Sequence, residues 1–238
     1  MRRHIPNTIT CCNLLSGCVA SVYAFEGVYK IAFVCIIMGA VFDFFDGLTA
    51  RALKVSSPIG KELDSLADVV TFGFAPATMV FSWLRECMEV QFATIVNCQL
   101  SIASSIIPFF AFLLVAFSAL RLAKFNVDER QTSSFIGLPT PANALFWGAL
   151  VLGSHDAVVA SPYGWVLVLA LVGLFSYLLV AEIPMFSLKF KSLSWKANRT
   201  AYIFLLVSLV LLIFLGLNGL SAVIGWYIIL SILTQKRA

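Results

Sequence analysis

Charged side chains are scarce in this chain, and their scarcity excludes most soluble folds. Asp, Glu, Lys and Arg together make up 12% of the 238 residues, whereas hydrophobic residues make up 61%. Soluble domains contain about 25% charged and about 45–50% apolar residues. The composition therefore predicts an integral membrane protein. Apolar runs follow one another so closely that residues 1–238 are expected to form one membrane-embedded domain.

The chain also has few groups that bind soft metals or nucleic acid. Its two histidines, His4 and His155, are isolated in the sequence and are expected near the surface without a functional role. The cysteines show no metal-ligand spacing, and most lie in apolar segments, where a thiol behaves as a small hydrophobe. Cys87 and Cys98 are the two that a disulfide could join. A net charge of +4, spread over short loops, does not predict a nucleic-acid partner.

Long apolar windows predict the fold class. A helix needs about 20 apolar residues to cross the hydrocarbon core. Eight segments approach this length, which predicts an all-α, polytopic bundle of about eight spanning helices: 11–26, 30–52, 60–84, 100–122, 141–155, 163–185, 200–216 and 219–235. The break at residues 217–219 leaves open a re-entrant feature and seven spans.

The basic residues predict the orientation, because Lys and Arg are retained on the cytoplasmic side of a membrane. With eight spans and a cytoplasmic N-terminus, only Lys30 and Arg85 fall outside. The other fourteen of the sixteen fall inside: Arg2, Arg3, Arg51, Lys54, Lys61, Arg121, Lys124, Arg130, Lys189, Lys191, Lys196, Arg199, Lys236 and Arg237.

Four of the twelve acidic residues lie inside apolar segments, near the predicted cytoplasmic ends. An ionised Asp at the centre of a spanning helix costs about 2.5–3.5 kcal/mol, so such residues face the protein interior and have partners. Helical spacing places the first pair on one face with two small residues, Gly47 and Ala50, and the second pair on one face of the next helix. Ser57-Pro58 is typical of a helix start. The four acids are Asp43, Asp46, Asp64 and Asp68.

Converging carboxylates repel one another unless a cation compensates them. Oxygen ligands without His or Cys favour Mg²⁺ or Mn²⁺. Two such ions would balance four carboxylates and still attract a phosphate-bearing substrate. The alternative is that these acids only form ion pairs with Arg51, Lys54 and Lys61 at the membrane edge.

The spacing of these acids resembles the signature of the CDP-alcohol phosphatidyltransferase family. The matching pattern is Asp43-Phe-Phe-Asp46-Gly47-Leu-Thr-Ala50-Arg51, eight residues, Gly60, three residues, Asp64, three residues, Asp68. The resemblance implies that Asp43, Asp46 and Asp64 are metal ligands and that Asp68 is both a ligand and the general base. It also implies that Gly47, Ala50 and Gly60 border the cytidine diphosphate, that Asp43 and Arg51 contact it, and that Arg51 helps to order the site.

Two further segments are similar to the phosphatidylserine synthase branch of that family. One is Pro6-Asn7-Thr8-Ile9-Thr10-Cys-Cys-Asn13, and the other is Arg121-Leu-Ala-Lys124-Phe-Asn126, followed by Phe135-Ile-Gly-Leu-Pro-Thr-Pro-Ala-Asn143-Ala. The resemblance places Asn7 and Thr10 at the cytidine diphosphate. It places Arg121, Lys124 and Asn126 at the serine or at a lipid phosphate, although the branch often has Arg at the position of Lys124. It covers a catalytic core of about residues 1–145, which the last three helices complete.

The function that the resemblance implies is transfer of the phosphatidyl group of CDP-diacylglycerol to L-serine, giving phosphatidylserine and CMP. Its implied partners are CDP-diacylglycerol, L-serine, membrane lipids and a second copy of the chain. The enzyme would lie in the cytoplasmic membrane, with its active site at the cytoplasmic face. Glycerol 3-phosphate is the alternative acceptor. A divalent cation transporter is the rival from another class, although the second half of the chain holds no counterpart of the four acids.

Overall fold

The structure is a computed structural model, which describes residues 4–55, 57–93, 102–128, 135–186 and 195–234. The described residues are nearly all helical, which confirms the all-α class. In chain order the elements are α1 (His4–Phe25), α2 (Tyr29–Leu53), α3 (Pro58–Asp68), the π-helix η1 (Val69–Phe74), α4 (Ala75–Ala93), α5 (Ile102–Ile106), the 3₁₀-helix η2 (Ile107–Phe112), α6 (Leu113–Val127), β1 (Phe135–Ile136), α7 (Thr140–Ala160), α8 (Gly164–Val180), β2 (Pro184–Met185), α9 (Trp195–Leu215) and α10 (Leu217–Leu233).

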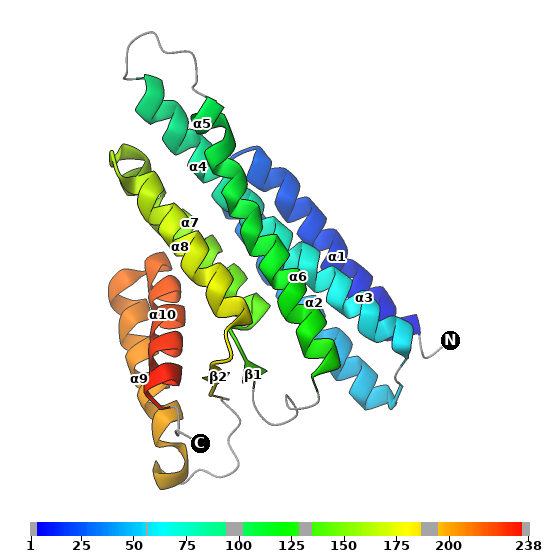
Figure 1. Cartoon of the computed structure of the whole chain (residues 1–238). Helices are drawn as coiled ribbons and strands as arrows, with labels where there is room; N and C mark the ends of the chain where they lie inside the picture. The colour runs from blue at the N-terminus through cyan, green and yellow to red at the C-terminus, as the bar shows by residue number, and fades with distance from the viewer. Residues whose placement is uncertain (1–3, 56, 94–101, 129–134, 187–194, 235–238) are drawn as a thin grey trace.

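The long rods of the bundle correspond to the apolar segments of the sequence (Figure 1). α3, η1 and α4 form one continuous rod, and α5, η2 and α6 form another. Within the described ranges, five helical rods are long and apolar enough to cross a membrane: His4–Phe25, Tyr29–Leu53, Pro58–Gln91, Ser104–Val127 and Asn198–Leu215. α8 and α10 are apolar but shorter. A total of eight spans therefore stays a prediction.

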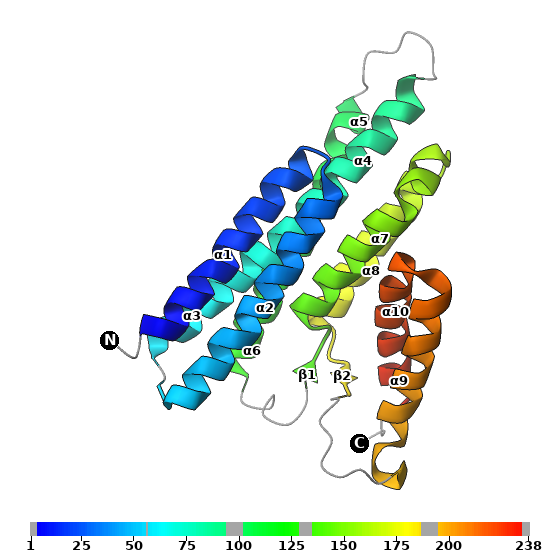
Figure 2. The same cartoon turned by 180° about the vertical axis from the view of Figure 1, so that it is seen from behind.

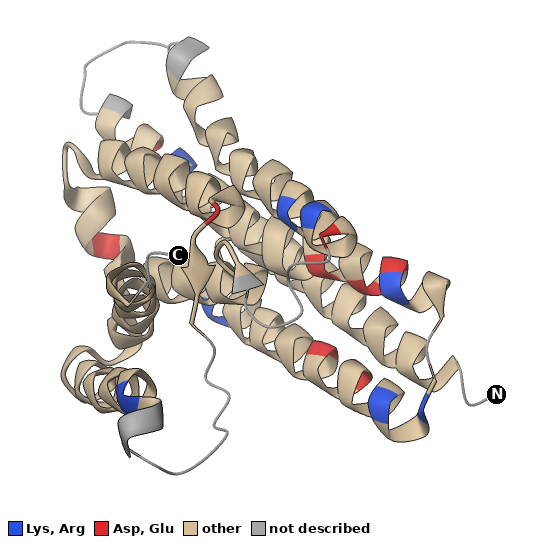
Figure 3. Ribbon diagram, turned by 60° about the horizontal axis from the view of Figure 1, so that its bottom comes forward, with Lys and Arg blue, Asp and Glu red and all other residues tan. Residues whose placement is uncertain are grey.

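The connections between the helices lie at the two ends of the bundle. The start of α1, the α2–α3 connection, the end of α6 and the β1–β2 pair lie at one end (Figure 1), called here the site end. Arg51, Lys54 and Lys61 lie at or beside that α2–α3 connection, whereas Lys30 follows the turn at the opposite end. Charged residues are sparse along the ribbons between the ends (Figure 3). This segregation agrees with the predicted charge pattern, and the cytoplasmic assignment of the site end stays a prediction.

Several residues used for the orientation lie outside the part of the chain that the structure describes. They are Arg2, Arg3, Arg130, Lys189, Lys191, Lys236 and Arg237, together with the side chain of Lys196. Cys98 also lies outside the described residues, so its pairing with Cys87 stays a prediction.

Close helix packing around η1 depends on two glycines. α2 lies between α1 and α7 (Figure 2), and both α1 and α2 contact η1. A Cβ at Gly17 would lie 2.5 Å from the Thr71 hydroxyl and 2.7 Å from its Cα, and a Cβ at Gly39 would lie 2.4 Å from Thr71 Cγ2. Small residues let helices in membranes approach this closely. η1 therefore sits against two helices at once, directly after Asp68.

The C-terminal part is a helical hairpin that packs on α7 through α10 (Figures 1 and 2). Gly216, with a φ of +56°, makes the turn between α9 and α10. A Cβ at Gly219 would lie 2.6 Å from the Leu211 carbonyl oxygen, so the two helices pack closely beside the turn. The sequence break at residues 217–219 is thus the start of a helix.

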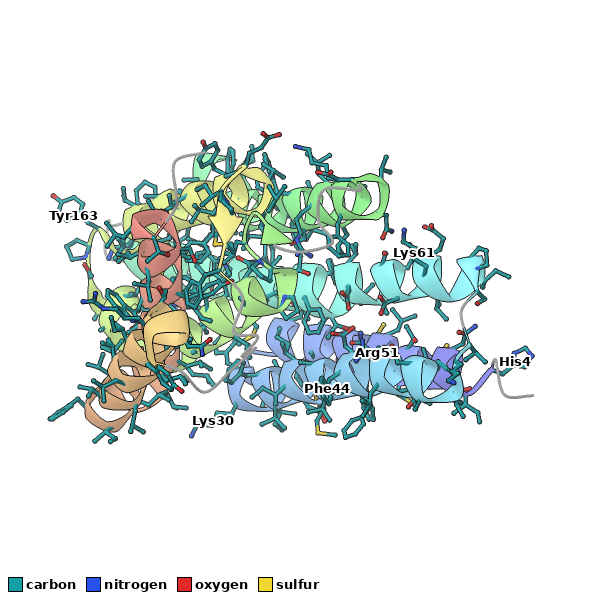
Figure 4. All side chains as sticks on the ribbon, turned by 90° about the horizontal axis from the view of Figure 1, so that it is seen from below. His4, Lys30, Phe44, Arg51, Lys61 and Tyr163 are labelled. Atoms are coloured by element: carbon teal, nitrogen blue, oxygen red, sulfur yellow. The ribbon has the colours of Figure 1, made fainter. Side chains whose placement is uncertain are left out.

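Large apolar side chains on the outer faces of the rods are exposed, as expected for groups that contact lipid. Phe44, on α2, is 61% exposed and points outward from the ribbon (Figure 4). The buried core lies between the rods and includes Ile36, Phe72, Trp83 and Trp147.

His155 takes part in a structural contact that its isolated position in the sequence did not indicate, and its lack of a functional role stays a prediction. Its Nε2 lies 2.8 Å from Glu86 Oε2, and its Nδ1 lies 3.0 Å from Asp156 Oδ1. The Tyr29 hydroxyl donates to the other oxygen of Glu86. These residues join α2, α4 and α7 at the end of the bundle opposite the site end, a contact that spacing along the sequence does not reveal.

Candidate functional site

The turn between α2 and α3 brings the two predicted acidic faces together. α2 ends at Leu53, and Lys54 adopts a left-handed conformation with a φ of +53°. α3 begins as predicted: the Ser57 hydroxyl accepts a hydrogen bond of 3.0 Å from the Gly60 N–H, and Pro58 occupies the first turn. Because this connection is short, the end of α2 and the start of α3 lie side by side.

Three of the four aspartates form a tight cluster. Asp43, Asp64 and Asp68 each offer a carboxylate oxygen, and these atoms all lie within 4.8 Å of one another. Asp46 lies beside this trio, where its Oδ2 accepts a hydrogen bond of 2.6 Å from the Thr10 hydroxyl. Asp46 and Asp68 are both buried. The structure therefore brings together carboxylates that are 25 positions apart in the sequence.

The cluster fits a divalent metal better than a set of ion pairs. Among the described residues, Arg51, Lys54 and Lys61 make no ion pair with these carboxylates. Lys61 instead donates a 2.9 Å hydrogen bond to the Asn126 carbonyl oxygen. Asp64 Oδ1 is buried without a hydrogen-bond partner. Closely spaced carboxylate oxygens are the ligands that Mg²⁺ and Mn²⁺ prefer.

A pocket of about 210 Å³ opens beside the aspartates. The start of α1, the end of α2 and the start of α3 line it, with Pro6, Asn7, Thr10, Asp46, Gly47, Ala50, Val55, Ser57, Gly60, Lys61 and Asp64. All five residues that the resemblance placed at the cytidine diphosphate, apart from the acids and Arg51, are among them. At Gly60 a Cβ would lie 3.1 Å from Asn7 Oδ1, so the absence of a side chain at Gly60 leaves room for Asn7 beside the pocket.

Arg51 does not line this pocket. It is exposed at the end of α2, and Figure 4 labels it together with Lys61 on the neighbouring helix. A Cβ on Gly47 would lie 3.7 Å from one of its terminal nitrogens, so the guanidinium lies along the same helical stripe as the acids. Its role at the site stays a prediction.

The three predicted residues of α6 do not share one environment. Arg121 and Lys124 line a second pocket, of about 310 Å³, with Ile136, Leu179 and Glu182 among its other walls. Asn126 instead donates a 2.8 Å hydrogen bond to the Ser65 hydroxyl and thereby joins α6 to α3. Arg121 and Lys124 therefore line the second pocket, whereas Asn126 does not.

Arg121 is almost fully buried. Its Nη1 lies 3.5 Å from the Thr140 hydroxyl, its guanidinium lies 5.4 Å from the centroid of the Phe125 ring, and its Nε has no hydrogen-bond partner. It also interacts electrostatically with Asp68, so positive charge from α6 reaches the acidic cluster. A buried guanidinium with a free donor is suited to bind an anionic group.

Comparison with known sequences supports the interpretation of this geometry. The sequence pattern of the CDP-alcohol phosphatidyltransferase family matches residues 3–177. The chain belongs to this family. The matched range contains the four aspartates, all the residues that line the first pocket, and η1.

Relatives within the CDP-alcohol phosphatidyltransferase family carry a common name. The chain is 30% identical over 230 residues to a CDP-diacylglycerol–serine O-phosphatidyltransferase of Helicobacter pylori, covering 96% of this chain and 89% of the relative. It is 34% identical over 142 residues to the protein of that name in Bacillus subtilis, covering 58% and 70%. It is 38% identical over 127 residues to the protein of that name in Saccharomyces cerevisiae, and the match covers 50% of this chain and 38% of the relative.

Sequence reasoning missed the residues that hold the aspartates in place. Asn13 Nδ2 donates a 3.2 Å hydrogen bond to Asp68 Oδ1, and the Thr71 hydroxyl donates 2.9 Å to the Asn13 carbonyl oxygen. The π-helix that starts directly after Asp68 was also not predicted. Polar residues inside an apolar helix were the available signal, since such residues normally have partners.

Proposed function

We propose that this chain transfers the phosphatidyl group of CDP-diacylglycerol to L-serine, which yields phosphatidylserine and CMP. The observation that carries the proposal is the acidic cluster at the edge of a polar pocket, in a chain whose relatives over most of its length are serine O-phosphatidyltransferases.

Asp43, Asp46, Asp64 and Asp68 would hold two divalent ions, Mg²⁺ or Mn²⁺. When bound, such ions supply positive charge that neutralises a pyrophosphate. The remaining walls of the first pocket would bind the cytidine diphosphate, with Asn7 and Thr10 on α1 and with Gly47, Ala50 and Gly60 leaving room for it. Arg51 would order the open edge of the pocket.

Asp68 is the proposed general base. Its Oδ1 accepts a hydrogen bond from Asn13, which leaves Oδ2 to take the proton of the serine hydroxyl. The serine oxygen then forms a bond to the phosphorus on the diacylglycerol side, the bond from that phosphorus to the bridging pyrophosphate oxygen breaks, and CMP leaves. Arg121 and Lys124 would hold the serine carboxylate or a lipid phosphate in the second pocket, and Asn126 would support them through its bond to α3.

We also propose where the protein lies, how it is organised and how it assembles. A substrate with a water-soluble head and two acyl chains suits a site near one end of a membrane bundle, so we place the site end at the cytoplasmic face of the cytoplasmic membrane. Residues 1–238 would form one domain, with the catalytic core in about residues 1–145, and two copies would form a homodimer.

The decisive test is CMP release from CDP-diacylglycerol by the purified full chain in detergent, with Mn²⁺ or Mg²⁺ present. L-serine, glycerol 3-phosphate, inositol and no acceptor are compared. We expect release that depends on serine and on the metal, and that a chelator abolishes. Release only with another alcohol would contradict serine as the acceptor. Absence of release with every acceptor, together with metal flux in vesicles, would favour a transporter.

A further inference from the structure

We propose that Asn13 is a positioning residue that fixes the Asp68 carboxylate within the acidic cluster. The inference rests on the proposed function, because it assigns to Asn13 the orientation of the group that takes the serine proton. Asn13 lies in the middle of α1, where an amide side chain facing lipid would be costly. It is fully buried, so its amide serves the protein interior.

The orientation of the Asn13 amide is determined by its neighbours. A carboxylate only accepts hydrogen bonds, so the Nδ2 group must be the one that faces Asp68 Oδ1, at 3.2 Å. The opposite atom, Oδ1, is directed toward α2, because a Cβ built on Gly39 would lie 2.9 Å from it. Gly39 lies one turn before Asp43, so the amide spans the gap between the two acidic helices.

A hydrogen bond from η1 holds Asn13 itself in place, and two glycines make room for it. The Thr71 hydroxyl of η1 donates to the Asn13 carbonyl oxygen at 2.9 Å, and the missing side chains of Gly17 and Gly39 allow η1 to come this close. η1 follows Asp68 directly. Asp68, which accepts from Asn13, and Thr71, which donates to Asn13, therefore belong to the same rod. The arrangement therefore locks α1 and α3 together at Asp68.

The consequence for chemistry is that one oxygen of Asp68 is occupied and the other stays available. Without Asn13, the carboxylate could rotate about its Cβ–Cγ bond, and either oxygen could turn away from Asp43 and Asp64. Groups that orient metal ligands in this way commonly contribute 10–100-fold to metal affinity or activity. The carboxamide oxygen of Asn13 is buried without a partner, which also suits a donor brought by a bound ligand or by water.

The test replaces Asn13 by residues that cannot donate. Asn13→Leu keeps the approximate volume without a donor, and Asn13→Ala removes the amide without adding a new polar group. We expect both variants to lower kcat for serine-dependent CMP release by about 10–100-fold, with little change in the KM for CDP-diacylglycerol. The Mn²⁺ concentration at the midpoint of the metal-induced rise in melting temperature should increase by a similar factor.

Ser21→Ala is the matched control, because it removes another buried side-chain hydrogen bond of α1, of 2.8 Å to the Gly17 carbonyl oxygen. It should leave both kcat and the Mn²⁺ midpoint unchanged. An unchanged midpoint and kcat in Asn13→Leu would overturn the proposal; if that variant does not insert, Asn13→Ala provides the same measurement. Absence of CMP release by the unmodified chain would refute the proposed function, whereas the Mn²⁺ midpoint would still decide the role of Asn13.

Discussion

At the scale of single residues, the site depends on short polar contacts from α1 to the acids. Thr10 donates to Asp46 and Asn13 donates to Asp68, so two of the four carboxylates are each held by one hydrogen bond from the same helix. Asp64 has no such partner for its buried Oδ1. Two of the acids are thus oriented by neutral donors, and neutral donors leave the negative charge of the carboxylates available to a divalent metal.

Replacing the acids one at a time tests this view. Asp43→Asn, Asp46→Asn, Asp64→Asn and Asp68→Asn should each lower CMP release at least 100-fold, because a neutral amide removes a ligand charge that the metals require. Near-normal release in two or more of these variants would contradict a shared metal site. Glu62→Gln is the control, since Glu62 is an exposed acid on the same helix, α3, and its variant should stay active.

At the scale of elements, η1 is the structure on which the site depends. π-helical turns inside α-helices occur frequently at functional sites. Here the π-helical segment begins directly after Asp68, and Gly17 of α1 and Gly39 of α2 leave room for its Thr71. The position of Asp68 relative to Asp43 therefore depends on packing about one turn away from each acid, at Thr71 and at Gly39.

Gly17→Ala tests this packing. Its new Cβ would come within 2.7 Å of the Thr71 Cα, so α1 and η1 must move apart. Overpacking of this kind costs about 1–3 kcal/mol, and we expect a lower melting temperature together with a loss of CMP release. Gly173→Ala in α8 is the matched control, because no heavy atom lies within 4 Å of its new Cβ. A helix-interior alanine there should leave stability unchanged or raise it. Equal melting temperatures for the two variants would contradict the assigned role of Gly17.

At the scale of the whole molecule, the chemistry and a separate anchoring network occupy opposite ends of the bundle. Glu86 of α4 contacts both Tyr29 of α2 and His155 of α7. The Trp83 indole N–H also donates to the His155 carbonyl oxygen, at 3.4 Å. These bonds tie three rods together where no predicted site residue lies, so their expected contribution is to stability.

Glu86→Ala separates stability from turnover. Removing the carboxylate leaves the Tyr29 hydroxyl without its acceptor, which should cost about 1–3 kcal/mol. We therefore expect a lower melting temperature in detergent, with kcat unchanged at temperatures where the variant is folded. Glu89→Gln is the control, because Glu89 forms an exposed ion pair with Arg85, at 3.6 Å, and such pairs contribute about 0–1 kcal/mol. A large loss of kcat in folded Glu86→Ala would refute a purely structural role.

The sequence by itself determined the all-α class and the two acidic faces that meet at the site. Apolar length determines helices that suit a membrane, and the spacing of Asp43, Asp46, Asp64 and Asp68 determines two acidic faces, because helical periodicity is a local property of the chain. The start of α3 at Ser57-Pro58 was predictable for the same reason.

Only the tertiary structure decided which side chains donate hydrogen bonds to those acids. The bonds from Thr10 to Asp46 and from Asn13 to Asp68 join residues 36 and 55 positions apart, and the Glu86–His155 contact joins residues 69 apart. The same packing separated Asn126 from Arg121 and Lys124, although the three lie within two turns of α6. Such contacts depend on how the rods pack and rotate against one another, and that depends on close approaches such as those at Gly17 and Gly39, which no local pattern encodes.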